Sequence, residues 1–111
     1  MRVSQLVDKL ALRVLTPDVS LEREVKCAYA GDLLSFVMAK GNEGTAWVTV
    51  QTHMNVIAVA CLHDFSCVII SESGDVPTDV LDRATEEKMP VLQSELSTYS
   101  LCGALCKFGV G

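Results

Sequence analysis

One stretch decides the fold of this chain: Thr45-Ala46-Trp47-Val48-Thr49-Val50-Gln51-Thr52-His53-Met54-Asn55-Val56-Ile57-Ala58-Val59-Ala60-Cys61-Leu62. Its first six residues are rich in β-branched and aromatic side chains, which favour a strand. From residue 54 onward, apolar side chains recur at helical spacing, at Met54, Ile57, Ala58, Cys61 and Leu62. We therefore predict a strand over 45–50 and a helix over 54–62. Val56, Val59 and Ala60 cover the other faces of this helix, so we expect it to be well buried.

Toward the C-terminus, the chain continues to alternate short strands with helices. Cys67–Ile70 is a continuous apolar run, which is typical of a central strand. A helix is predicted from Pro77 and Thr78 to about Lys88, with Val80, Leu81 and Ala84 facing inward. A brief strand, Val91-Leu92, follows. The last helix is capped by Ser97 or Thr98, buries Leu101, Leu105 and Phe108, and ends at Gly109.

Toward the N-terminus, the same reasoning predicts four elements. They are a helix over 3–10, a short strand over 12–15, a strand over 24–30, and a helix capped by Asp32. The apolar stripe of that second helix is Leu33, Leu34, Val37 and Met38, and the Gly41–Gly44 segment ends it.

From residue 24 onward, the predicted order is four repeats of a strand followed by a helix. Strands that alternate with helices imply a mostly parallel sheet with helices on both faces. The predicted fold class is α/β, a three-layer α/β/α sandwich, in a single domain over 1–111. We expect Trp47 to lie in its core.

Composition excludes several classes of function. Half of the 111 residues are hydrophobic, which is enough for a compact core. The net charge is −5, and nine basic residues are outnumbered by fourteen acidic ones, so no nucleic-acid partner is expected. The longest apolar run, 56–62, is far shorter than the ~20 residues that span a membrane. Without a signal-peptide core, the expected location is cytoplasmic, with no membrane partner.

The chain also lacks the common catalytic motifs. The phosphate loop G-x-x-x-x-G-K-[ST], the dinucleotide fingerprint G-x-G-x-x-G and the nucleophile pattern G-x-S-x-G are all absent. We therefore predict no catalytic residue and no enzymatic activity. The acidic helix surface around Asp79, Asp82, Glu86 and Glu87 is explained by solvation and by a pair between Asp79 and Arg83. His63 closes the 54–62 helix, where a cation interacts well with the helix dipole.

The five cysteines are Cys27, Cys61, Cys67, Cys102 and Cys106. In a reducing cytoplasm they are expected to be small buried hydrophobic residues. Cys102 and Cys106 lie four residues apart on a predicted helix, so they share a face and offer an alternative role in thiol or metal sensing. Their spacing matches no zinc pattern, and no metal site or cofactor is predicted.

The segment Trp47–Ala60 resembles the central signature of stand-alone DRTGG-domain proteins. The segments Tyr29–Met38 and Leu96–Leu105 are similar to other parts of the same family, so the resemblance covers nearly the whole chain. It implies a fold like the N-terminal domain of HPr kinase/phosphorylase, a regulatory role, and hosts that are mainly anaerobes. The literal string Asp-Arg-Thr-Gly-Gly is absent, so no residue role is carried over.

Loops that follow parallel strands gather at one edge of the sheet, where α/β proteins bind ligands. The loop residues predicted to bind a ligand are Gly31, Asp32, Gln51, Thr52, His53, Asn55, Ser71, Gly74, Ser97 and Thr98. We expect a shallow polar site for an anionic small molecule such as a nucleotide, with helix N-termini supplying backbone N–H groups. His53 is interpreted equally well as a ligand-binding donor or as the cap of a helix.

Two alternatives remain open at this point. The domain can be a protein-interaction module that forms a homodimer and docks onto a metabolic or redox enzyme through an apolar surface. It can also be a thiol or metal sensor that uses Cys102 and Cys106.

Overall fold

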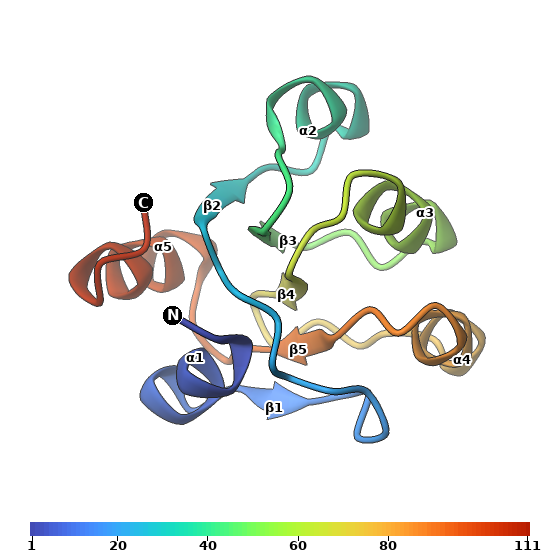
Figure 1. Cartoon of the computed structure of the whole chain (residues 1–111), viewed down its shortest axis with the longest axis horizontal. Helices are drawn as coiled ribbons and strands as arrows, with labels where there is room; N and C mark the ends of the chain where they lie inside the picture. The colour runs from blue at the N-terminus through green and yellow to red at the C-terminus, as the bar shows by residue number, and fades with distance from the viewer.

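The computed structural model describes residues 1–111, which form five helices and one five-stranded sheet (Figure 1). The strands are β1 (Arg13–Val14), β2 (Cys27–Ala30), β3 (Thr45–Thr49), β4 (Cys67–Ile70) and β5 (Val91–Gln93). The helices are α1 (Val3–Leu10), α2 (Leu34–Lys40), α3 (Met54–Leu62), α4 (Thr78–Glu86) and α5 (Thr98–Lys107). The predicted alternation of strands and helices from residue 24 onward is confirmed.

The sheet is mostly parallel, as predicted. Its strand order is β1-β5-β4-β3-β2; β2 through β5 run parallel in sequence order, and β1 is antiparallel to β5. β4 is the central strand, and β3 lies between β2 and β4, with Trp47 opposite Tyr29 of β2 and Val68 of β4. All five residues of β3 are buried, because helices cover both of its faces.

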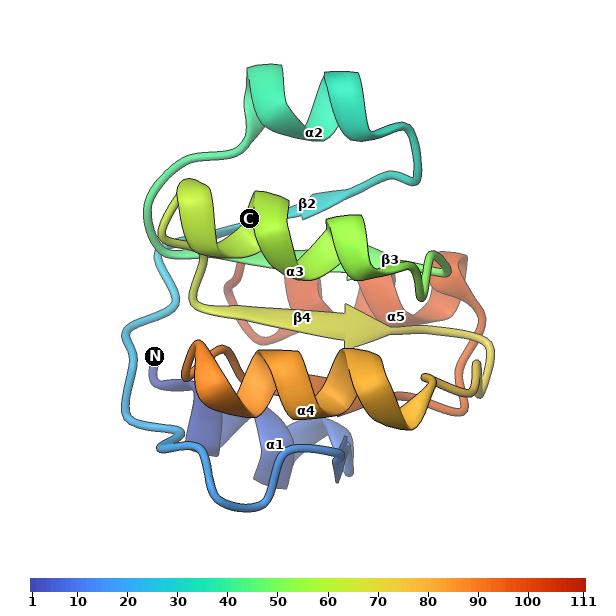
Figure 2. The same ribbon diagram turned by 90° about the vertical axis from the view of Figure 1, so that its right-hand side faces the viewer.

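The helices form two layers, which confirms the α/β/α sandwich. α2, α3 and α4 cover one face of the sheet, and α1 and α5 cover the other (Figures 1 and 2). Parallel strands connected in sequence order return through crossover helices of one hand, so α2, α3 and α4 share a face. Each face of the sheet has its own apolar core. Trp47 is fully buried in the core that α2, α3 and α4 cover, and its ring lies edge-on to that of Phe65. The prediction that Trp47 belongs to the core is confirmed.

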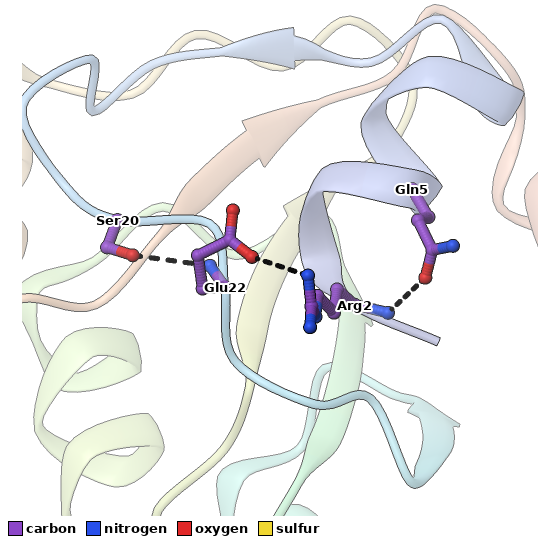
Figure 3. Close-up of polar contacts among 4 residues, drawn as sticks. All are labelled: Arg2, Gln5, Ser20 and Glu22. Atoms are coloured by element: carbon purple, nitrogen blue, oxygen red, sulfur yellow. Dashed lines mark hydrogen bonds and ion pairs between the residues drawn. The ribbon is translucent and has the colours of Figure 1, made fainter.

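The connection from β1 to β2 is held against the start of α1 by polar contacts (Figure 3). The Arg2 guanidinium donates to Glu22 at 3.2 Å, the Arg2 backbone N–H donates to Gln5 Oε1 at 2.8 Å, and the Glu22 N–H donates to Ser20 Oγ at 3.3 Å. These groups are exposed, so the contacts position the connection more than they stabilise it.

The strand predicted over 24–30 is shorter in the structure and begins at Cys27. Val25 donates its backbone N–H to the Met1 carbonyl at 2.7 Å, and Glu24 forms a bridge with Arg2. Residues 24 and 25 therefore follow the N-terminal segment rather than the sheet.

The prediction that α3 is well buried is wrong in part. The structure buries Val56, Ile57, Val59 and Ala60, while Ala58 is exposed and Leu62 is 72% exposed. Met54 and Cys61 are half-buried. Nearly every residue of α3 is apolar, so the spacing of apolar residues cannot distinguish its inward face from its outward face.

The stripe predicted for α2 is also mostly wrong. Only Val37 is buried and Leu34 is half-buried, whereas Leu33 and Met38 are exposed. Asp32 does not cap this helix: Leu33 occupies the N-cap position, with no side-chain hydrogen bond to the helix.

On α4, two details differ from the prediction. The helix ends at Glu86, because Lys88 adopts a left-handed backbone conformation with φ 59°. Arg83 pairs with Glu87 at 3.2 Å rather than with Asp79. No helix in the structure combines the length and the apolar composition needed to cross a membrane.

Candidate functional site

The carboxyl ends of β2, β3, β4 and β5 meet at one edge of the sheet, because these four strands are parallel neighbours. We call this the carboxyl edge. The loops that follow the strands carry nearly all ten residues predicted to bind a ligand, so the predicted convergence of those loops is found in the structure. The ten residues fall into two groups. The open half follows β2 and β3, and the closed half follows β4 and β5.

In the closed half, the polar groups bind one another. The hydroxyl groups of Ser71 and Thr98 lie 2.6 Å apart, and Gln93 Nε2 donates to the Gly74 carbonyl at 2.8 Å. Backbone bonds join the same loops, because Glu72 donates its N–H to the Leu96 carbonyl at 2.8 Å. These contacts hold the β4–α4 loop against the β5–α5 loop.

A carboxylate of the chain itself occupies the N-terminus of α5. Glu72 Oε2 accepts the backbone N–H of Thr98 at 3.1 Å, and Ser97 Oγ accepts that of Ser100 at 3.1 Å. A negative charge at this position interacts favourably with the helix dipole. Ser97 is therefore the cap of α5, as predicted, while the place predicted for a ligand anion is already held by Glu72.

The turn that places Glu72 is strained. Glu72 and Ser73 both have left-handed backbone conformations, with φ of 61° and 55°. Such a conformation costs roughly 1–2 kcal/mol for a residue other than glycine. Gly74 follows them, and a Cβ there would lie 2.9 Å from Ile70 Cγ2, so the loop packs tightly on β4.

In the open half, Asp32 joins two loops instead of capping α2. Its Oδ1 accepts the Thr49 hydroxyl at 2.7 Å and the Val50 backbone N–H at 2.9 Å. Gln51 Nε2 donates to the Asp32 carbonyl at 3.4 Å. Beneath Asp32, the buried Trp47 donates its indole N–H to the Gly31 carbonyl at 2.9 Å. The β2–α2 loop is thus fixed to the end of β3.

His53 begins α3 at the outer side of the open half. Its Nδ1 accepts the Asn55 backbone N–H at 3.1 Å, so His53 caps the helix, which was one of its two predicted roles. A neutral ring that accepts through Nδ1 carries its proton on Nε2, which remains a donor. The side chains of Gln51, His53 and Asn55 are exposed, and that of Thr52 is half-buried. The open half therefore presents its hydrogen-bonding groups to solvent.

A mainly hydrophobic groove of about 430 Å³ lies between α3 and α4 and adjoins this edge. It reaches the open half at Met54 and Asn55 and is otherwise lined mainly by Ile57, Ala58, Cys61 and Leu62, with Arg83 and Glu87 at its side. The exposed outward face of α3 forms its floor.

The prediction that the cysteines are buried holds only for Cys67. Cys106 is exposed, and Cys27, Cys61 and Cys102 are half-buried. Burial raises the pKa of the Cys67 thiol to about 12, and burial together with nearby Cys106 raises the pKa of Cys102. A raised pKa keeps these thiols protonated and poorly reactive. No group of three or more His, Cys, Asp and Glu side chains is arranged to hold a metal ion.

Three residues that organise the edge are not among the ten predicted to bind a ligand: Thr49, Glu72 and Gln93. The sequence places Glu72 and Gln93 in the predicted loops without indicating their partners, and Thr49 was not among the predicted loop residues. Glu72 meets Thr98 across 26 positions of sequence, and Thr49 meets Asp32 across 17. Nothing in a single sequence marks such pairs. The only available signal was position, because each of these residues lies at or just after the end of a predicted strand.

His63 ends α3 as predicted, but its Nε2 is buried without a hydrogen-bond partner. Its ring lies 6.0 Å from that of Phe65. The imidazole therefore packs against the core at the opposite edge of the sheet and takes no part in the carboxyl edge.

The fold and the edge define a class: a small three-layer α/β domain whose parallel strands carry polar loops at one end. A family model described as the HPr serine kinase N terminus matches residues 47–108, which is more than half of the chain. The chain belongs to this family. No curated protein sequence matches the chain.

A solved structure with a similar fold contains the CBS and DRTGG domains of the regulatory region of Clostridium perfringens pyrophosphatase, complexed with its activator, diadenosine tetraphosphate. The TM-score is 0.71 at 8% identity, over 93% of this chain and 45% of the other. The chain thus spans less than half of that structure, and the likeness is one of fold. Together with the family match, it confirms the resemblance to DRTGG proteins.

Proposed function

We propose that this chain is a non-catalytic regulatory domain that senses an anionic small molecule, such as a nucleotide, at the open half of the carboxyl edge. One observation carries this proposal. Gln51, His53 and Asn55 expose hydrogen-bonding side chains around the N-terminus of α3, a nine-residue helix. Backbone N–H groups at such an N-terminus, together with the helix dipole, favour an anion.

The closed half is a poorer candidate, although Ser71, Gly74, Ser97 and Thr98 were predicted to belong to the site. Their groups already have partners inside the chain: Ser71 and Thr98 bond to each other, the Thr98 N–H donates to Glu72, the Gly74 carbonyl accepts from Gln93, and Ser97 Oγ accepts from Ser100. A ligand there would have to displace an internal carboxylate from the α5 N-terminus. The proposal therefore places binding at Gly31, Asp32, Gln51, Thr52, His53 and Asn55.

The related pyrophosphatase regulatory region, which binds diadenosine tetraphosphate, supports a ligand of this class. The negative charge of Asp32 at this edge favours a ligand that binds together with a cation. Asp32 lies within the open half, so a polyphosphate would meet a carboxylate there. A bound Mg²⁺ would reduce this repulsion, because the ion prefers carboxylate and phosphate oxygens.

Isothermal titration calorimetry tests the proposal directly. The probes are diadenosine tetraphosphate, ATP, AMP and inorganic phosphate, each with and without magnesium chloride. We expect binding of at least one nucleotide, weakened about tenfold, roughly 1.4 kcal/mol, in a His53→Ala variant. Tyr99→Ala is the matched control, because Tyr99 is 89% exposed on α5 in the closed half.

Amide chemical shifts locate the site independently of heat. Binding at the open half should shift the resonances of residues 51–56 and leave residues 72–74 and 96–100 unchanged. Absence of heat and of shifts with every probe would overturn the proposal. Shifts confined to the β4–α4 and β5–α5 loops would move the site to the closed half.

A second candidate function, docking of a partner protein, is favoured by the groove between α3 and α4. Its floor is apolar, and the two charged residues at its side, Arg83 and Glu87, pair with each other at 3.2 Å. Such an apolar groove beside a helix fits the apolar face of an amphipathic helix.

Fluorescence anisotropy with a labelled amphipathic helix tests this docking function, with a peptide of the same composition and scrambled sequence as the control. Docking predicts that the amphipathic helix binds more tightly and that Leu62→Asp abolishes the difference. Equal binding of the two peptides would argue against it.

A further inference from the structure

The end of the sheet at β2 is an unpaired edge. β2 pairs only with β3, so the outer side of Cys27–Ala30 has no strand beside it. Natural proteins protect such edges with charged side chains, proline, or very short strands. β1, at the other end of the sheet, has two residues and carries Arg13. β2 has four residues and no charged side chain or proline.

The surfaces on both sides of this edge are apolar. α2 is the outermost helix beside β2 (Figure 2), and its Leu33 and Phe36 are 60% and 61% exposed. On the other face of the sheet, a groove of about 140 Å³ runs between β2 and α5. Ala28, Ala30, Cys102 and Cys106 line it. We call the edge strand with these two flanks the β2 end.

The charge of the β2 end differs from that of the rest of the molecule. Residues 27–40 and 98–106 contain one acidic residue, Asp32, and one basic residue, Lys40, although the chain has fourteen acidic and nine basic residues. The Asp32 carboxylate is turned inward to Thr49 and Val50. Apart from Lys40, a strongly charged partner has no opposite charge to pair with at the β2 end, and a second copy of the chain meets little like-charge repulsion there.

The size of the β2 end also fits a second copy of the chain. The molecule measures 33 × 29 × 24 Å, so one end offers on the order of 700 Å², close to the about 800 Å² per partner of a standard interface. A two-fold interface uses the same patch on both copies, so the patch must complement itself. An uncharged edge strand with apolar flanks meets this condition, because antiparallel pairing places each backbone donor opposite an acceptor.

We propose that a second copy of this chain binds at the β2 end, with the two β2 strands paired antiparallel across a two-fold axis. The two five-stranded sheets then form one continuous sheet. The α2 and α5 flanks of one copy pack against those of the other and cover Phe36 and Cys106. Because the paired strands are antiparallel, the two carboxyl edges face opposite directions, and each keeps its own ligand site. This inference is independent of the proposed ligand.

Light scattering coupled to size exclusion tests the assembly. The chain has a mass of 12.0 kDa, and the proposal predicts twice that mass at micromolar concentration. The double variant Ala30→Lys, Phe36→Lys should raise the dissociation constant at least about thirtyfold, because it buries like charges at the two-fold axis. Both side chains are exposed, so the fold should persist, as circular dichroism will show.

The control is Leu62→Lys, which places one lysine on the 72% exposed Leu62 of α3, away from the β2 end. It should remain a dimer. A monomeric wild type, a trimer or larger assembly, or a dimer that Leu62→Lys disrupts and the double variant does not, would overturn the proposal.

Hydrogen exchange distinguishes strand pairing from a looser apolar contact. Amides of residues 27–30 should become more protected as protein concentration rises, and the double variant should lose this dependence. The two-residue β1 at the other edge should show no dependence on concentration. A dimer without concentration-dependent protection at residues 27–30 would also overturn the proposal.

Discussion

The two halves of the carboxyl edge are built from the same kinds of residue and end in opposite states. In the closed half, Ser71 binds Thr98 and the Glu72 carboxylate holds the N-terminus of α5. In the open half, Asp32 turns inward to the end of β3, and the polar side chains from Gln51 to Asn55 face solvent.

This difference shows that polar residues after a strand do not by themselves make a ligand site. What matters is whether their partners are inside the chain. A satisfied donor must break one bond to form another, so a ligand gains little from it. In the open half, the side chains of Thr52 and Asn55 and the Nε2 atom of His53 have no partner inside the chain, so this half is the one that can bind a ligand.

The largest effect we expect comes from the base of the open half. Thr49 is buried; its hydroxyl donates to Asp32 and accepts the Gln51 N–H at 3.1 Å. Thr49→Val removes both bonds and should lower the free energy of unfolding by about 2 kcal/mol, measured by urea denaturation. Thr52→Val on the half-buried neighbouring loop residue is the control and should cost under about 0.5 kcal/mol. Equal losses would mean that Asp32 does not organise this half.

The closed half should respond more weakly to the loss of one hydroxyl. Ser71→Ala and Thr98→Val each break the 2.6 Å contact between the two side chains and should each cost about 1 kcal/mol. Because both variants break the same bond, the double variant should cost less than the sum of the two. Strict additivity in thermal or urea unfolding would show that the two hydroxyl groups are not coupled.

The pattern of apolar residues along the chain decided which parts of the fold could be predicted. Cys67–Ile70 is buried on both faces, and a continuous apolar run predicts that state directly. Thr45–Thr49 is also buried, and its β-branched and aromatic residues predicted a strand there. The parallel sheet then followed from the alternation of strands and helices. The inward face of α3 could not be predicted, because apolar side chains surround that helix. The start of β2 was misjudged because Val25 pairs with Met1, a contact between distant residues.

The candidate site divides in the same way. The edge at which loops gather depends only on strand direction, so the sequence was sufficient to predict that the candidate site lies at the carboxyl edge. Whether each side chain there is free to bind a ligand depends on the hydrogen-bond partners that folding brings next to it. Asp32 has a typical capping residue type, yet its carboxylate finds Thr49 and Val50 on the next strand. A rule for helix caps uses only neighbouring residues, so it cannot account for these competing hydrogen bonds to another strand.

Substitutions of His53 test whether this residue binds a ligand or serves only to cap α3. His53→Ala removes the helix cap and should cost roughly 0.7 kcal/mol in urea unfolding, within the usual range for caps. His53→Asn restores a capping side chain, so stability should return, while the Nε2 donor stays absent. If nucleotide affinity falls in both variants, His53 binds the ligand as well as capping α3. If His53→Asn restores affinity together with stability, His53 acts only as a cap.

The smallest expected effect is the most direct test of the comparison. Glu72→Gln keeps an oxygen that can accept the Thr98 N–H but removes the charge at the α5 N-terminus. Because Glu72 is exposed, the loss of its interaction with the dipole should cost only about 0.4 kcal/mol and should shrink as sodium chloride screens it. The variant also removes the internal anion that excludes others. In the wild type, inorganic phosphate should shift amides of the open half only, whereas in Glu72→Gln it should also shift Thr98 and its neighbours. If phosphate shifts Thr98 equally in both proteins, Glu72 does not close that half, and the two halves differ for another reason.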